Sequence, residues 1–365
     1  MTDQHARGLF LRSMPSPFLV TAALILLGLV IENSTNAYTQ DVVLWIFTNI
    51  ILAASLNLVS GFTGQFSLGH AGFMAVGAYL SAWCSFRPEF QALPDLLRFT
   101  LLPAIGGLGA AIAGYIVGLP SLRLRGDYLA IVTLGFGEII RVTLLNTEAV
   151  GGARGLNRIP ATEGWLEMGL SPYLAQFSIA SFWTVVTITT LWRIVHSQKG
   201  RIFLSVREDE IAAEAMGVNV TQAKVRAFVI SAFFAGVGGS LFAHSVKYLS
   251  PATFSFTKSV DIIIMIVLGG MGSFTGSVIA AIFITLVPEF VLRPLQEITK
   301  VDLRMVIYSL ILILFMIMRP TGLLGTREWS DFAWVKKLMR AISQLLKRGS
   351  DGDSSSSTSP SGASR

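Results

Sequence analysis

The sequence predicts an all-α, polytopic integral membrane protein with about ten transmembrane or re-entrant helices. Of its 365 residues, 52% are hydrophobic and only 14% are charged, whereas an ordinary soluble domain has roughly 25% charged residues. The apolar residues form blocks of about 15 to 22, which are long enough to cross a hydrocarbon core as helices. The net charge is +6, but Lys and Arg flank the apolar blocks instead of forming an aromatic-studded basic face. The positive charge therefore indicates membrane topology and not nucleic-acid binding.

The predicted spans are apolar runs flanked by polar or turn residues. They cover residues 17–32, 41–59, 66–85, 99–119, 127–146, 173–195, 226–246, 258–270, 274–292 and 302–318. The first run is expected to be a retained anchor and not a signal peptide, because no convincing small-residue cleavage site follows it. Gly269, Gly270, Gly272 and Gly276 interrupt the eighth and ninth runs, so these two either span separately or form one re-entrant or broken element.

The distribution of basic residues predicts that both termini lie in the cytoplasm. When the N-terminus is placed inside, most Lys and Arg fall on the cytoplasmic side, and an even number of spans agrees with this orientation. The expected organisation is a cytoplasmic N-terminal segment (1–16), a permease domain (17–320), a basic amphipathic segment on the inner leaflet (321–349) and a disordered Ser-rich tail (350–365).

A glycine-rich segment between the second and third spans, GFTGQFSLGHAGFMAVG (61–77), places polar groups at membrane depth. These groups are Gln65, Ser67 and His70, and the glycines include Gly61, Gly64 and Gly69. One interpretation is a tight helical hairpin in which glycine permits close packing. The other is a broken helix that lines a translocation path, with the three polar side chains facing water.

The fifth span contains two charged residues, Glu138 and Arg141. They are three residues apart and so lie on one helical face, where each neutralises a charge that would otherwise cost at least ~3 kcal/mol near the bilayer centre. The pair either fixes the rotation of its helix or lines the translocation path. His244 is expected to be a packing residue, because it shares no metal-like spacing with a second ligand.

The long loop from 196 to 226 contains a predicted short helix within residues 207–220. Acidic residues favour the start of this helix, its body is rich in alanine, and Gly217 can end it. A cytoplasmic helix with a small apolar face (Ile211, Ala215, Met216) suits docking in a partner's groove, although an ordinary solvated loop is the alternative. The candidate docking residues are Glu210, Ile211, Ala212, Glu214, Ala215 and Gly217.

Several kinds of chemistry have no matching residues in the sequence. The single cysteine, Cys84, lies in an apolar run, which argues against a disulfide framework, a structural zinc site or an iron-sulfur cluster. The chain has no Gly-x-x-x-x-Gly-Lys-Ser/Thr loop for nucleotide phosphates, no Gly-x-Ser-x-Gly elbow and no His-Glu-x-x-His pair. We therefore predict no catalytic residue, metal site or cofactor in this chain.

Four segments taken in order, GFTGQFSLGHAGF, LGFGEIIR, REDEIAAEAMGVNV and VLGGMGS, resemble the permease subunits of bacterial branched-chain amino acid ABC importers, specifically the LivM type. The resemblance covers roughly residues 40 to 320. It implies a multi-pass protein of the bacterial inner membrane with a LivH-like second permease, two cytoplasmic ATPases that use the ATP, and a periplasmic solute-binding protein. The loop around Glu214 to Gly217 is similar to the family's coupling helix, although it lacks the distal Leu-Pro of the general pattern.

Three alternatives remain open at this point. A urea or short-amide importer belongs to the same superfamily and would share the docking loop. An ion-coupled secondary transporter would carry paired carboxylates at mid-span, and only Glu138 fits that pattern. An integral-membrane enzyme would need a catalytic residue set, which the sequence does not display.

Overall fold

The computed structural model describes residues 17–122, 124, 126–160 and 171–293, together with 309–310, 313–314, 317–319 and 322–325. Within these residues the chain is almost entirely helical. Its one described sheet is an antiparallel pairing of β1 (Leu156–Asn157) with β2 (Tyr248–Leu249). The predicted segments at 1–16 and 350–365, and most of 302–318 and 321–349, lie outside the described residues.

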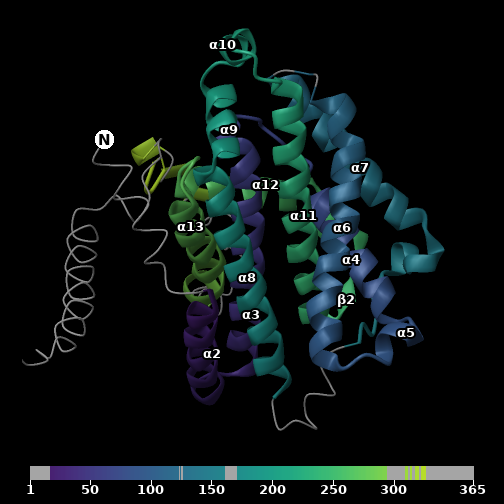
Figure 1. The fold of residues 1–365 in the computed structure, drawn as a ribbon. Helices are drawn as coiled ribbons and strands as arrows, with labels where there is room; N and C mark the ends of the chain where they lie inside the picture. Colours follow the sequence, from purple (N-terminus) through teal and green to yellow (C-terminus); the bar gives the residue numbers. More distant parts are fainter. Residues whose placement is uncertain are drawn as a thin grey trace, which may run out of the picture. The chain divides into compact units, whose positions relative to one another are not determined.

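The α-helices follow the predicted apolar runs closely (Figure 1). In chain order they are α2 (Pro17–Ser34), α3 (Ala37–Asn57), α4 (His70–Ser85), α5 (Pro88–Gln91), α6 (Asp95–Ser121), α7 (Asp127–Asn146), α8 (Pro172–His196), α9 (Gln198–Glu208), α10 (Glu210–Ala215), α11 (Val220–Val246), α12 (Phe256–Gly269) and α13 (Phe274–Leu286). Two π-turns, η1 (Leu58–Phe62) and η6 (Val287–Leu292), extend α3 and α13, and three short 3-10 turns are η2 (Glu148–Val150), η3 (Gly152–Arg154) and η5 (Pro251–Phe254).

Five described helices are long and apolar enough to cross a membrane. They are Ala37–Phe62, Asp95–Ser121, Tyr128–Asn146, Pro172–His196 and Val220–Val246. The prediction of an all-α, polytopic membrane protein is confirmed. The third predicted span is wrong at its start, because residues 63–69 form no regular structure and α4 begins only at His70.

Helix α11 lies at the centre of the bundle and packs against α3, α4 and α6. Glycines allow the backbones of three of these helices to meet. A Cβ atom on Gly106 of α6 would lie 2.7 Å from the carbonyl oxygen of Gly77 in α4, and one on Gly236 of α11 would lie 2.6 Å from the carbonyl oxygen of Gly106. Because no side chain fits between them, the three helices approach closely and gain van der Waals contact, as small residues allow in membranes.

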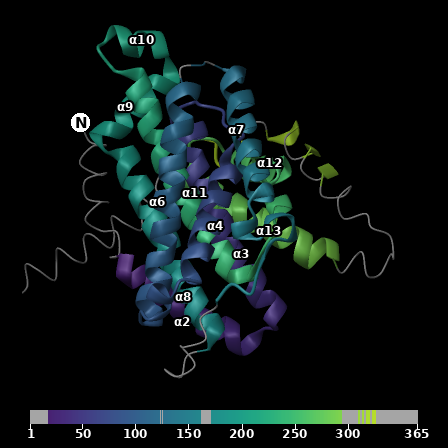
Figure 2. The ribbon, with the colours of Figure 1, turned by 90° about the vertical axis from the view of Figure 1, so that its right-hand side faces the viewer.

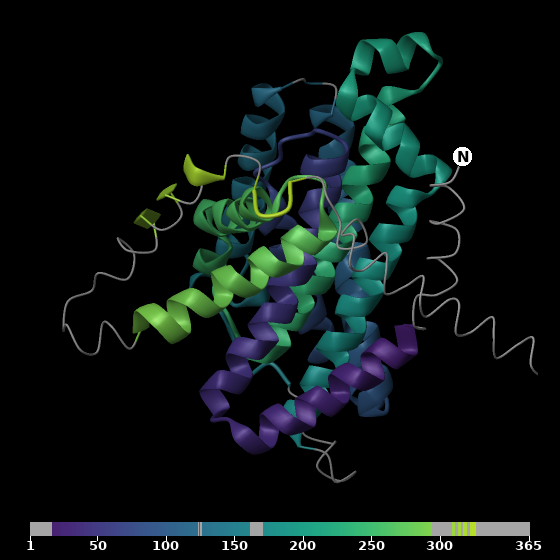
Figure 3. The same ribbon diagram turned by 90° about the vertical axis from the view of Figure 1, so that its left-hand side faces the viewer.

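A second group of helices packs around α3. α8, α12 and α13 all contact α3, and α2 packs against α8. Figure 3 shows α13 running obliquely across the other helices. The interrupted eighth and ninth runs are thus two short helices, α12 and α13, which pack against each other on either side of a break at residues 270–273. This outcome matches the broken-element alternative.

We expect Gly236→Ala to lower the free energy of unfolding by about 1–3 kcal/mol, because the added methyl group would overpack the contact with α6. Gly135→Ala in α7 is the matched control, since a Cβ there meets nothing within 4 Å. It should leave stability unchanged or slightly raised. Thermal unfolding of the purified chain in detergent measures both. Equal midpoints for the two variants would contradict the packing argument.

Candidate functional site

Helices α9 and α10 form an arm at one end of the bundle (Figure 1). The arm bends at Asp209, whose extended backbone separates the two helices. The Asp209 Oδ1 atom accepts hydrogen bonds from the backbone N–H groups of Ile211 at 2.8 Å and Ala212 at 3.0 Å, which caps α10. Gly217, with φ of +83°, ends the turn in the left-handed conformation that glycine favours. The short helix predicted within 207–220 is therefore present as α10.

The tip of the arm exposes apolar side chains. Ile211 is 69% and Met216 is 84% exposed, while Ala213 is buried against the rest of the arm. Ala212, Glu214 and Ala215 are exposed as well. Large apolar side chains exposed at such a tip are a feature of protein-binding surfaces. The predicted apolar face exists, and its docking role stays a prediction.

Two polar contacts attach the arm to the membrane helices. Glu210 at the start of α10 forms an ion pair with Lys224 of α11, whose side chain is buried. Arg207 near the end of α9 donates a hydrogen bond from Nη1 to the carbonyl oxygen of Gly61 at 2.8 Å. A Cβ atom on Gly64 would lie only 3.4 Å from the Arg207 Cα atom. The arm is thus attached directly to the glycine-rich segment, a contact that sequence reasoning missed.

The glycine-rich segment is an irregular crossing between α3 and α4. After the π-turn η1, the backbone N–H of Gln65 donates to the carbonyl of Val59 at 3.1 Å, and Gly64 adopts φ of +69°. The backbone N–H of Leu68 donates to Thr133 Oγ1 of α7 at 3.1 Å. Residues 63–69 are thus irregular, and α11 packs against the helices on both sides of them. Both interpretations of the segment, the tight hairpin and the broken helix that lines a path, stay predictions.

The three polar side chains predicted to line a path are buried within this chain. Gln65 donates from Nε2 to Thr63 Oγ1 at 3.0 Å. The His70 Nε2 atom lies 2.9 Å from Ser55 Oγ, and the Ser55 carbonyl accepts a hydrogen bond from Ser231 of α11. Ser67 is 2% exposed. These contacts give His70 a packing role between α3, α4 and α11, and a path role for the three residues stays a prediction.

Asn57 is the last residue of α3, directly before the irregular crossing to α4. Its side chain connects this region with the break between α12 and α13. Its Nδ2 group donates to the carbonyl oxygen of Ser273 at 2.9 Å and to Ser277 Oγ at 2.8 Å, and its Oδ1 atom accepts from the backbone N–H of Gly272 at 2.9 Å. The side chain is fully buried. We call this contact the Asn57 junction. It satisfies the backbone N–H of Gly272, which the break between α12 and α13 leaves without a helical partner.

The predicted structural glycines lie at these breaks. Gly270 and Gly272 have φ of +110° and +94°, which favours glycine. A Cβ atom on Gly61 would lie 2.5 Å from the Gly272 backbone nitrogen, so the two breaks touch. Gly69 lies against the backbone of Thr133, and Gly269 lies against Gly276. Glycine at these positions therefore allows either a positive φ or a close approach between two backbone segments.

Glu138 and Arg141 line a groove of about 380 Å³ on the exposed side of α7. The groove lies beside α4 and α12, and Figure 2 shows the ribbons of these two helices next to α7. Arg141 donates from Nε to Glu138 Oε1 at 2.8 Å and from Nη2 to the same oxygen. The predicted pairing is confirmed. The remaining lining residues are Leu68, Ala71, Gly72, Leu134, Gly137, Phe254, Ser255, Phe256 and Ser259.

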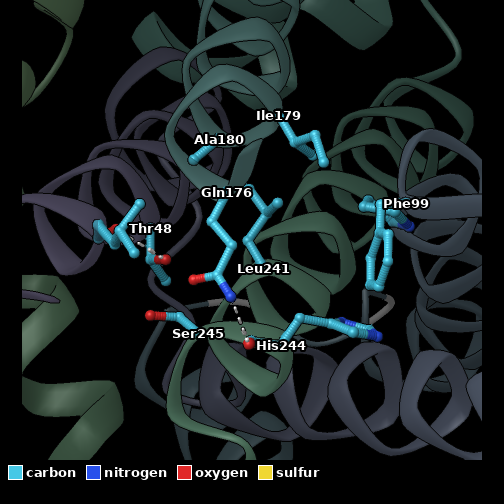
Figure 4. Close-up of a pocket in the computed structure, with 10 residues that line it drawn as sticks. Thr48, Phe99, Gln176, Ile179, Ala180, Leu241, His244 and Ser245 are labelled. Atoms are coloured by element: carbon cyan, nitrogen blue, oxygen red, sulfur yellow. Dashed lines mark hydrogen bonds between the residues drawn. The ribbon is translucent and has the colours of Figure 1, made fainter. Parts of the chain in front are cut away.

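A smaller cavity of about 30 Å³ lies between α3, α6, α8 and α11 (Figure 4). Gln176 donates there from Nε2 to the carbonyl oxygen of His244 at 3.4 Å, and the His244 ring packs edge-on to Phe99. A cavity of this size holds one or two water molecules and no amino acid. The expected packing role of His244 agrees with these contacts, and the larger groove is the stronger candidate for a solute.

The described residues contain no group of three or more His, Cys, Asp or Glu that could hold a metal ion. Cys84 has no disulfide partner in the described part of the chain. The features that the structure brings together are an exposed apolar tip, a polar link from the arm to an irregular crossing, and a groove with one charge pair. Together with the five described helices that are long and apolar enough to cross a membrane, these features are typical of a membrane transport protein.

Comparison with known proteins identifies the family. Residues 38–316 match the family described as branched-chain amino acid transport system, permease component, and the chain belongs to that family. The chain is 37% identical over 329 residues, 84% of this chain and 74% of the relative, to the high-affinity branched-chain amino acid transport system permease protein LivM of Escherichia coli strain K12.

Two further relatives agree with this assignment. The LivM permease of Salmonella typhimurium is 35% identical over 325 residues, 83% of this chain and 73% of the relative. The LivH permease of the same organism is 24% identical over 301 residues, 77% of this chain and 92% of the relative. No solved structure matches the chain significantly. The family assignment confirms the resemblance that the four sequence segments predicted.

We expect Asn57→Ala to lower the free energy of unfolding by about 1–3 kcal/mol, because it removes the acceptor of a buried backbone N–H at Gly272. Asn146→Ala is the matched control. That side chain is exposed and donates within its own helix to the Val142 carbonyl at 2.8 Å, so its loss should change stability little. Chemical denaturation in detergent measures both, and a smaller effect at Asn57 than at Asn146 would contradict the junction.

Proposed function

We propose that this chain is the LivM-like permease subunit of an ATP-driven importer that moves branched-chain amino acids into the cytoplasm. The similarity to LivM permeases over most of the chain carries this proposal. ATP hydrolysis belongs to separate subunits, since the sequence has no phosphate-binding loop. The exposed tip at Ile211 and Met216 is the surface through which those subunits act.

The proposed assembly has the composition that the family resemblance implies. A LivH-like second permease completes the membrane pathway, two cytoplasmic ATPases bind the arms of the two permeases, and a periplasmic solute-binding protein delivers the substrate. The complex lies in the inner membrane of a bacterium, with both termini and α10 on the cytoplasmic side. The excess of Lys and Arg on that side of the predicted spans supports the orientation.

The contacts of the arm suggest how ATP-driven motion reaches the membrane interior. When the ATPases close, they displace α10, and α9 moves with it. Arg207 transmits this displacement to the irregular crossing at Gly61, and the Asn57 junction passes it on to the break between α12 and α13. Such a switch needs contact energies that differ between its two states, and an irregular backbone segment can change conformation more easily than an intact helix.

Reconstitution tests the function directly. The chain is purified with the second permease and the two ATPases from its own operon, inserted in proteoliposomes, and supplied with the matched binding protein and labelled leucine, urea or acetamide. ATP-dependent accumulation of leucine supports the proposal. Accumulation of urea or acetamide alone, or uptake that follows an ion gradient without ATP, would refute it.

The tip of the arm should be required for ATPase binding. We expect the double substitution Ile211→Glu and Met216→Glu to abolish co-purification of the ATPases, because two charges would enter an apolar contact. Phe86→Glu is the matched control, since Phe86 is an exposed aromatic residue that directly follows α4 at the opposite end from α10. ATPase capture that survives the double substitution would remove the docking role from the tip.

Arg207 should be required for coupling and not for docking. We expect Arg207→Met to leave the ATPases bound and hydrolysing ATP while leucine uptake falls about tenfold, the change expected for losing a hydrogen bond to a charged group. Arg201→Met is the control, because Arg201 is an exposed residue of the same helix. The measurement is the ratio of leucine transported to ATP hydrolysed, and an unchanged ratio in Arg207→Met would contradict transmission through this residue.

A further inference from the structure

The Glu138 and Arg141 pair lies on a helix that is little buried within this chain, and a role in packing α7 against its neighbours explains it poorly. It is near the middle of α7, and only 17% of that span is buried, against 83% for the span that contains α3. The side chains remain 46% and 22% exposed, respectively. Charged groups inside membranes almost always face a protein interior or a water-filled cavity. We therefore expect this face of α7 to be covered by protein or by water and not by lipid.

The pair is only partly used by its internal contact. Both hydrogen bonds that Arg141 donates to Glu138 end on one oxygen, Oε1. A guanidinium group has five N–H donors and a carboxylate has about four acceptor sites. Within the described residues, the remaining donors of Arg141 and the Oε2 atom of Glu138 thus retain capacity to bind an additional partner.

The groove beside the pair has the size and chemistry of a small-molecule site. Its volume of about 380 Å³ falls in the range of roughly 300–1,000 Å³ that is typical of ligand pockets. Leu134, Phe254 and Phe256 supply apolar surface. Nearby, Ser259 Oγ already accepts the backbone N–H of Ala71 at 3.1 Å. One side of the groove therefore carries one positive and one negative charge, which leaves no net charge. The rest of its lining is mainly apolar.

We propose that this groove binds the zwitterion of an aliphatic α-amino acid on its way through the membrane. The ligand carboxylate pairs with the Arg141 guanidinium, the ligand ammonium pairs with the Glu138 carboxylate, and the aliphatic side chain lies against Leu134 and Phe254. Because the ligand and the pair are each neutral overall, binding adds no net charge at membrane depth. Urea and short amides lack both ionic groups and would gain little from the pair.

This inference rests on the proposed function and assigns the substrate contact to particular residues. The test uses the full transport complex in detergent, without binding protein, in a Cys84→Ala background. Phe256→Cys places a thiol in the groove at a residue that is 49% exposed, and Ser255→Cys is a second reporter if the first variant fails to assemble. Glu89→Cys on the exposed helix α5 is the control outside the groove. The readout is the rate of maleimide labelling.

Leucine should slow labelling at Phe256→Cys and not at Glu89→Cys. Isocaproate, which lacks the ammonium group, leucinamide, which lacks the carboxylate, and urea should protect much less. The neutral double variant Glu138→Gln and Arg141→Gln should label at the parent rate without leucine, which shows an intact groove. It should require about tenfold more leucine for protection, as expected for losing charge-assisted hydrogen bonds.

The charge-swapped variant Glu138→Arg and Arg141→Glu should regain part of the leucine protection, because it again offers one cation and one anion. Equal leucine protection in the parent and in the double glutamine variant would overturn the proposal. So would a complex that transports leucine while leucine leaves labelling of the groove unchanged, and in that case the proposed function would stand. A complex with no ATP-dependent leucine uptake would instead refute the function on which the proposal rests.

Discussion

In the hydrocarbon region every backbone polar group must find a partner inside the protein. At the break between α12 and α13 one such partner is Asn57, and others are the backbone N–H groups of Leu323 and Leu324, which donate to the carbonyls of Leu268 and Gly269. The Asn57 amide binds Gly272, Ser273 and Ser277 from the end of α3. Irregular backbone can exist there because this buried side chain and those backbone donors together replace the missing helical hydrogen bonds. The Asn57 contact holds the break against the end of α3, next to the glycine-rich crossing.

The junction also explains why the two glycine-rich segments lie together. Gly61 and Gly272 approach so closely that a Cβ on Gly61 would lie 2.5 Å from the Gly272 nitrogen. Arg207 reaches the same point from the arm and binds the Gly61 carbonyl. The groove begins a few residues further along, at Leu68. The arm and the groove are therefore joined by a short, contiguous set of packed groups, through which the proposed displacement would pass.

Patterns of nearby residues in the sequence predicted those features of the fold that depend on the spacing of residues along the chain. Long apolar runs located the spanning helices, and the glycine clusters located both breaks. The three-residue separation of Glu138 and Arg141 predicted their contact, and the acidic start and glycine stop predicted α10. The start of the third span was wrong, because apolar residues such as Phe66 and Leu68 continue into the irregular crossing and conceal where the helix begins.

The contacts that sequence reasoning missed join residues far apart in the chain. Asn57 and Gly272 are separated by 215 positions, and Arg207 and Gly61 by 146. Asn57 belongs to no motif, and Arg207 begins the segment REDEIAAEAMGVNV but nothing in that segment points to Gly61. A single sequence therefore gives no signal for these two contacts. The groove is missed for the same reason, since α4, α7 and α12 together form it. Burial of Gln65, Ser67 and His70 likewise follows from how α11 packs against α3 and α4.

Hydrogen–deuterium exchange of the assembled complex tests the central claim most directly, because it reports backbone hydrogen bonding in both breaks at once. Exchange is compared between nucleotide-free complex and complex trapped with ATP and an inactive ATPase. The account predicts that residues 61–69 and 270–273 change their exchange together on ATP binding, while the helical backbone of α6 does not. Unchanged exchange in both segments, in a complex whose ATPases have closed, would contradict transmission from the arm through Arg207 to the Asn57 junction.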